Sequence, residues 1–219
     1  MLFSDLHLSM PLLKAIQEEG YTHPTPVQEQ AIPAILKGQD ILAGAQTGTG
    51  KTAAFGLPIL QKIDVTTYHP QALVLCPTRE LCLQIADDLN DYSKYIDNLK
   101  VLPVYGGSSI ESQIKTLKRG VHVVVATPGR LLDLMNRKTV DLSLVKNVIM
   151  DEADEMLNMG FTDSINAILA EVPENRNMLL FSATMPKEIA NITKKYMKNP
   201  KEIVIGNKNE GNKNIRDIY

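Results

Sequence analysis

The chain has 219 residues, of which 44% are hydrophobic and 22% charged, and its formal net charge is −2 at pH 7. This ordinary globular composition fits one α/β domain or two small ones, and it gives no global sign of a nucleic-acid binder, so any such partner must be held by a local patch. Cys76 and Cys82 have no His or Cys cluster beside them, so they support neither a four-ligand zinc site nor a disulfide framework. The lack of a signal pattern or membrane-length apolar run predicts a cytoplasmic protein without a membrane partner.

Short runs rich in Val, Ile and Leu alternate with longer segments of helical period along the whole chain. The expected helices are 26–38, one that begins at Lys51 and kinks or ends at Pro58, then 79–92, 108–120 and 162–173. The runs expected as buried strands are 40–45, 72–77, 101–106, 122–128, 147–152, 177–183 and 202–206. This order predicts an α/β fold with a mainly parallel sheet, helices on both faces and ligands at the carboxyl ends of the strands.

The composition changes after the last expected strand to the polar stretch "NKNEGNKN". Residues 1–206 are therefore expected to form one domain, and residues 207–219 to begin a linker toward a second domain that the chain does not contain.

The stretch "AQTGTGKT" at 45–52 joins the first expected strand to a helix. Successive backbone N–H groups in such a turn form an anion nest, Lys51 can reach β- and γ-phosphates, and the Thr52 hydroxyl can bind Mg²⁺. The general phosphate-loop pattern requires Gly where the chain has Ala45, which is tolerable if the φ of this residue is negative. The residues expected to hold a nucleotide here are Ala45, Thr47, Gly48, Thr49, Gly50, Lys51 and Thr52.

A carboxylate for the metal is expected at the end of a neighbouring buried strand. Asp151 and Glu152 follow the apolar run 148–150 and point in different directions, so Asp151 can join Thr52 as a Mg²⁺ ligand while Glu152 acts as base toward a water. An acidic tetrapeptide alone is usually a solvated turn. Paired with the loop at 45–52, it predicts a nucleoside triphosphatase site with Lys51, Asp151 and Glu152 as the catalytic residues.

Residues 151–154 spell D-E-A-D, and the chain resembles the DEAD-box ATP-dependent RNA helicases of superfamily 2. The resemblance covers essentially the whole chain as the amino-terminal RecA-like, P-loop domain of a bacterial enzyme, and Ala45 fits that family's version of the phosphate loop. Phe3 and the segment 20–28 resemble the Q motif, in which Gln28 pairs with the adenine edge while Phe3 and Tyr21 pack near the base. An amide matches the donor and acceptor of adenine, which favours ATP over GTP.

Further motifs of the resemblance imply contacts with RNA. Arginines, hydroxyls and glycines beside helix N-termini suit a sugar–phosphate backbone rather than base edges, so binding independent of RNA sequence is implied. The implied contact residues are Pro77, Thr78, Arg79, Gly106, Gly107, Thr127, Pro128, Gly129 and Arg130. Ser182 and Thr184 resemble the S-A-T motif, which bonds to Asp154 in the family and couples hydrolysis to strand separation.

The resemblance implies an RNA-stimulated ATPase that unwinds RNA duplexes locally, and a second RecA-like domain that completes the ATP site with arginine fingers. Without that domain we expect nearly no activity. Two other functions stay open at this point. An ATP-gated RNA clamp would scaffold a complex with little unwinding, whereas a metabolic P-loop kinase would leave Gln28 and the RNA-type motifs without a role.

Overall fold

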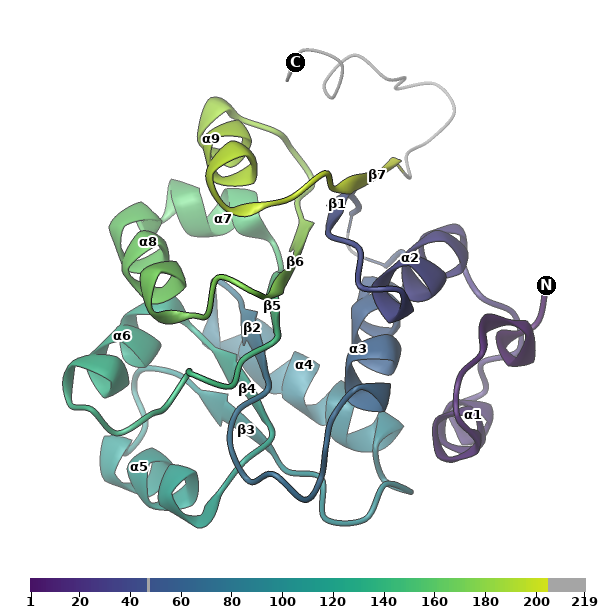
Figure 1. The fold of residues 1–219 in the computed structure, drawn as a ribbon, viewed down its shortest axis with the longest axis horizontal. Coiled ribbons are helices and arrows are strands. Elements are labelled where there is room, and N and C mark those ends of the chain that lie inside the picture. The colour runs from purple at the N-terminus through teal and green to yellow at the C-terminus, as the bar shows by residue number, and fades with distance from the viewer. Residues whose placement is uncertain (47, 205–219) are drawn as a thin grey trace.

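A computed structural model describes residues 1–46 and 48–204 of the chain (Figure 1). Its strands are β1 (Ile41–Gly44), β2 (Ala72–Leu75), β3 (Val101–Val104), β4 (Val123–Ala126), β5 (Asn147–Met150), β6 (Asn177–Phe181) and β7 (Lys201–Val204). Its helices are the 3₁₀ turn η1 (Phe3–Leu6), α1 (Met10–Glu18), α2 (Pro26–Leu36), α3 (Lys51–Gln61), α4 (Arg79–Tyr92), α5 (Ile110–Arg119), α6 (Pro128–Asn136), α7 (Ala153–Asn158), α8 (Thr162–Glu171) and α9 (Lys187–Tyr196).

The strands form one sheet in the order β3-β4-β2-β5-β6-β1-β7, and every pairing is parallel. All seven predicted strands are therefore confirmed, as is the α/β fold with a parallel sheet. Central strands are buried on both faces, which explains why the sequence shows continuous apolar runs instead of alternation.

Helices lie on both sides of this sheet (Figure 1), and the buried residues form two hydrophobic cores. Alternate strand residues point to alternate faces, so Ile41 and Ala43 belong to one core while Leu42 belongs to the other. The first core is closed by helices α1 to α4, and the second by α6 to α9 with partly buried residues of α5. Helices thus cover both faces, as predicted.

The helix that begins at Lys51 was expected to kink or end at Pro58, and the expected end is wrong, because α3 continues through this residue to Gln61. Residues 53–60 are all buried, and the packing of this helix between α2 and α4 outweighs the backbone hydrogen bond that a proline cannot donate. The predicted apolar face of 162–173 is confirmed, since Ile165, Ile168 and Leu169 are buried in the second core. Within the described residues, no helix is long and apolar enough to cross a membrane.

The topology brings three polar strand ends together. β6 lies between β1 and β5, so the phosphate-loop segment after β1, the acidic segment after β5 and the Ser182 segment after β6 leave the sheet at the same edge. In parallel sheets this carboxyl edge is where ligands bind.

Candidate functional site

The described residues of the loop between β1 and α3 include two glycines in the left-handed conformation, as an anion nest requires. Gly48 and Gly50 adopt left-handed φ angles of 87° and 79°, and Gly50 caps α3. A Cβ at Gly50 would lie 2.5 Å from Nε2 of Gln28, so both conformation and space require glycine there. Ala45 is buried and does not adopt a positive φ, which satisfies the condition under which alanine is tolerable. Thr47, also predicted to contact the nucleotide, lies outside the described residues.

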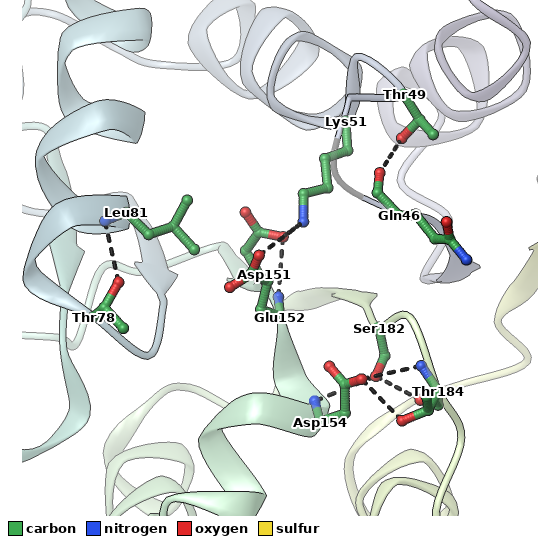
Figure 2. Close-up of polar contacts among 10 residues, drawn as sticks. All are labelled: Gln46, Thr49, Lys51, Thr78, Leu81, Asp151, Glu152, Asp154, Ser182 and Thr184. Atoms are coloured by element: carbon green, nitrogen blue, oxygen red, sulfur yellow. Dashed lines mark hydrogen bonds and ion pairs between the residues drawn. The ribbon is translucent and has the colours of Figure 1, made fainter.

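Lys51 joins this loop to the acidic segment (Figure 2). Its Nζ lies 2.9 Å from Oδ1 of Asp151 and 3.8 Å from Oε1 of Glu152. Burial raises the pKa of the Asp151 and Glu152 carboxyls. The nearby Lys51 ammonium lowers both pKa values, but burial has the larger effect on each carboxyl. The three predicted catalytic residues are therefore in contact, in surroundings where a cation is favourable.

Asp151 has one carboxylate oxygen to offer a metal. Oδ1 accepts from the Glu152 backbone N–H at 3.0 Å and pairs with Lys51, whereas the buried Oδ2 has no hydrogen-bond partner among the described residues. An unpartnered buried carboxylate oxygen is costly unless a cation or a metal-bound water satisfies it. Thr52 begins the same helix as Lys51 and is half-buried. These oxygen donors fit a hydrated Mg²⁺.

Glu152 adopts a strained backbone conformation. Its φ of 51° and ψ of 50° are left-handed, which is uncommon for a residue other than glycine, and it caps α7. The turn leaves Asp151 buried while the Glu152 side chain is 29% exposed. Two adjacent carboxylates thus have different surroundings, as expected for different roles.

Replacing Glu152 with Gln is expected to raise the melting temperature of the domain at neutral pH. The pKa of Glu152 is raised in the folded chain above its ordinary 4.5, so ionisation costs stability as pH rises through the folded pKa, and the cost vanishes below the ordinary value. The gain should therefore be present at about pH 8 and absent at about pH 4 in thermal unfolding. The exposed Glu174→Gln variant is the control, because Glu174 is not among the charges that act on Glu152, and a lower melting temperature for Glu152→Gln at about pH 8 would contradict this sign.

The Q-motif segment, residues 20–28, is hydrogen-bonded to the phosphate loop just before α3 begins. Gln28 is 4% exposed; its Oε1 accepts from the Thr25 backbone N–H at 2.9 Å, and its Nε2 donates to the Gly50 carbonyl at 3.1 Å. The Thr25 hydroxyl donates to the Thr49 carbonyl at 2.9 Å. Gln28 is thus no surface residue, and each end of its amide keeps one further hydrogen-bonding position. Thr25 was not predicted as a site residue, although T-P-V-Q fits the capping-box pattern that the structure contains.

The two aromatic residues expected near the base lie beside each other. Phe3 and Tyr21 stack with ring centroids 6.2 Å apart, and the Tyr21 hydroxyl lies 3.0 Å from that of Tyr92. Phe3 is 5% exposed and packs in the first core, whereas Tyr21 is 37% exposed. Of the pair, Tyr21 therefore offers the surface that a base could contact.

Asp154 is bound to the segment after β6, as the resemblance implied (Figure 2). Its Oδ2 accepts from the Thr184 backbone N–H at 3.1 Å and from the Thr184 hydroxyl at 2.9 Å. The Ser182 hydroxyl lies 3.2 Å from the Asp154 backbone N and donates to the Thr184 carbonyl at 2.6 Å. The acidic segment and the S-A-T segment therefore form one connected unit.

The three segments expected to contact RNA follow β2, β3 and β4, which are neighbours at one side of the sheet. Thr78 and Thr127 cap α4 and α6, and the Thr78 hydroxyl accepts from the Leu81 N–H at 3.2 Å. Arg79, Gly106, Gly107 and Gly129 are exposed, Arg130 is half-exposed, and Pro77 and Pro128 are buried. These segments therefore lie together at the carboxyl edge of the sheet, the same edge that carries the phosphate loop, and both arginines are accessible.

The chain matches the family model described as DEAD/DEAH box helicase over residues 25–192. It is 50% identical over 217 residues to the ATP-dependent RNA helicase DeaD of Mycobacterium tuberculosis, covering 99% of this chain and 38% of the relative. It is 53% identical over 208 residues to the DEAD-box ATP-dependent RNA helicase CshA of Streptococcus pneumoniae, covering 95% and 40%. The chain thus spans less than half the length of these curated relatives.

Solved structures agree with these sequence matches. A DEAD box protein from the hyperthermophile Methanococcus jannaschii superposes with a TM-score of 0.90 at 45% identity, over 94% of this chain and 56% of that one. A hypothetical ATP-dependent RNA helicase from Sulfolobus tokodaii gives a TM-score of 0.83 at 43% identity, over 90% and 57%.

Proposed function

Because the chain belongs to the DEAD/DEAH box helicase family and has its RecA-like α/β fold, we propose that it is the nucleotide-binding domain of an ATP-dependent RNA helicase. The observation that carries this proposal is the contact of Lys51 with Asp151 and Glu152, which joins a phosphate cradle to two carboxylates. The relatives are named as ATP-dependent RNA helicases, which favours a helicase over an RNA clamp. A metabolic kinase would leave the arginine-bearing segments after β2 and β4 unused.

ATP and Mg²⁺ are the ligands that these residues fit. The phosphates would be held by Lys51 and by the backbone N–H groups of 45–52, and the metal by Thr52 and the unpartnered oxygen of Asp151. Bound Mg²⁺ supplies positive charge that neutralises the phosphate oxygens.

The chain's own groups then have distinct tasks. Lys51 exchanges carboxylate partners for phosphate oxygens, which it can do because its ammonium already lies at the meeting point of both segments. Glu152, whose pKa is raised by burial, accepts a proton from the attacking water at its carboxylate. Asp154 couples ATP hydrolysis to the Ser182 and Thr184 segment through the hydrogen bonds described above.

RNA is proposed to bind along the segments after β2, β3 and β4, where Arg79, Gly107 and Arg130 contact its sugar–phosphate backbone. We further propose that residues 1–206 form one RecA-like domain, that residues 207–219 begin a linker, and that a second RecA-like domain completes the ATP site. The cytoplasmic location inferred from the sequence stays a prediction.

Multiple-turnover unwinding by the longer protein separates a helicase from a clamp, because a clamp releases RNA slowly.

Calorimetric titration of the 219-residue chain with ADP and GDP tests the nucleotide assignment. ADP should bind more tightly by roughly 5- to 150-fold, the range for a bidentate contact to a base edge, because Gln28 keeps a free donor and acceptor for adenine. Gln28→Ala should remove this preference, whereas the exposed Gln30→Ala on the same helix should keep it. Equal affinities of the wild-type chain for ADP and GDP would remove Gln28 from base recognition.

A further inference from the structure

Gln113 is a buried glutamine on a helix that is otherwise largely solvated. It is 6% exposed, and α5 buries no other residue to this extent. Burying an amide is unfavourable unless its donor and acceptor find partners, so the partners of this side chain indicate why it is there.

Those partners belong to two of the segments proposed to bind RNA. Nε2 of Gln113 donates to the Tyr105 carbonyl at 3.2 Å and to the Ser108 hydroxyl at 2.8 Å. Oε1 accepts from Nη1 of Arg130 at 3.0 Å, and the same Nη1 donates to the Ser108 carbonyl at 3.1 Å. One amide therefore connects both ends of the glycine loop 105–108 to the arginine of the next segment.

The third RNA segment joins the same loop. The Arg79 guanidinium lies over the Tyr105 ring at 5.0 Å from its centroid, within range of a cation–π contact. Arg79 and Arg130, from α4 and α6, are thus both oriented by the loop that Gln113 holds.

We propose that Gln113 is a positioning residue for RNA binding, which fixes Arg130 and the loop 105–108 as one rigid surface for a sugar–phosphate backbone. This inference rests on the proposed RNA-binding function. Nη1 of Arg130 is occupied by protein acceptors, and no hydrogen bond of Nε or Nη2 to the described residues is present, so these donors are left for a phosphate while Nη1 fixes the guanidinium. A preoriented arginine loses less conformational entropy on binding than a free one.

The test replaces Gln113 with Met, which keeps the length and volume of the side chain but removes its hydrogen bonds. Affinity for a fluorescein-labelled decauridylate is measured by anisotropy at low and moderate salt, and an ADP titration checks that each variant is folded. We expect RNA to bind roughly three- to ten-fold more weakly to Gln113→Met. Gln113→Asn, which cannot reach all three partners, should show a loss in the same direction and is used if the Met variant does not fold.

Gln71 supplies a matched control. It is 8% exposed and makes three comparable hydrogen bonds to the loop 64–67, but it lies at the amino end of β2, away from the proposed RNA surface. Gln71→Met should lower thermal stability about as much as Gln113→Met and leave RNA affinity unchanged. Equal RNA affinity for Gln113→Met and wild type would overturn the inference.

A double-mutant cycle with Arg130→Ala separates this inference from the proposed function. If Gln113 acts through Arg130, adding Gln113→Met to Arg130→Ala should weaken RNA binding much less than it weakens the wild type. Additive losses would mean that Gln113 does not act through Arg130. Failure of the wild-type chain to bind the oligonucleotide, or an Arg130→Ala variant that binds normally, would instead contradict the proposed RNA surface itself.

Discussion

Glu152→Gln is expected to reduce ATP turnover by the longer, two-domain protein by roughly 10²–10⁴ while leaving ATP binding nearly intact. The carboxylate is proposed to accept a proton from water, which an amide cannot do, and this contact is needed mainly in the transition state. The Lys51 ammonium lies 3.8 Å from Oε1 of Glu152 but 2.9 Å from Oδ1 of Asp151, so the substitution preserves the closer ion pair.

Lys51→Ala should have the opposite profile, because it removes a charge that holds phosphate in the ground state. Nucleotide affinity should fall strongly in titrations with ADP. The variant also leaves the buried Asp151 without its ion pair, so its thermal stability must be measured alongside. Lys62→Ala, which removes a cation from just beyond the other end of the same helix, is the control for charge alone.

Steady-state phosphate release and single-turnover hydrolysis together distinguish these profiles. A Glu152→Gln enzyme with near wild-type turnover would remove Glu152 from the mechanism. A Lys51→Ala chain that is folded and binds ADP as tightly as wild type would remove the phosphate role of Lys51. The exposed Glu155→Gln variant should behave as wild type in both assays.

The main layers of the fold were predictable because they depend on local periodicity. Runs such as 123–126 are buried on both faces, so they are apolar throughout and stand out from the helices that follow them. The extent of α3 was not predictable, since a proline usually ends a helix and only the packing of residues 53–60 keeps this one intact. The order in which strands pair is likewise set by packing between distant segments.

Site residues could be predicted where reactive side chains come just after a strand, as Lys51 and Asp151 do. They could not be predicted where a side chain connects segments far apart in the sequence. Gln113 lies 17 residues from Arg130 in a helix whose charged residues read as a solvated surface, and nothing local marks it as buried. The resemblance did name Gln28 as a site residue, but its hydrogen bond to Gly50, 22 residues away, was not predicted.

Hydrolysis by the 219-residue chain alone is expected to be weak and almost unresponsive to RNA. In phosphoryl-transfer enzymes an arginine finger is worth roughly 10³–10⁵ in rate, and the resemblance places these arginines on a second domain. The described residues bring one cation, Lys51, to the two carboxylates of the site, and the arginines Arg79 and Arg130 lie with the segments after β2 and β4 instead.

The decisive comparison is steady-state ATPase with and without single-stranded RNA, on this chain and on the same chain continued through the second domain. Glu152→Gln versions of both proteins supply the background rate. RNA should stimulate only the longer protein, because it is proposed to draw the two domains together around the nucleotide. The chain alone should still bind RNA weakly, with affinity falling as salt rises, since its contacts are to phosphates. Strong RNA-stimulated turnover by residues 1–219 would mean that the catalytic site is complete within one domain, and the proposed dependence on a second domain would then be wrong.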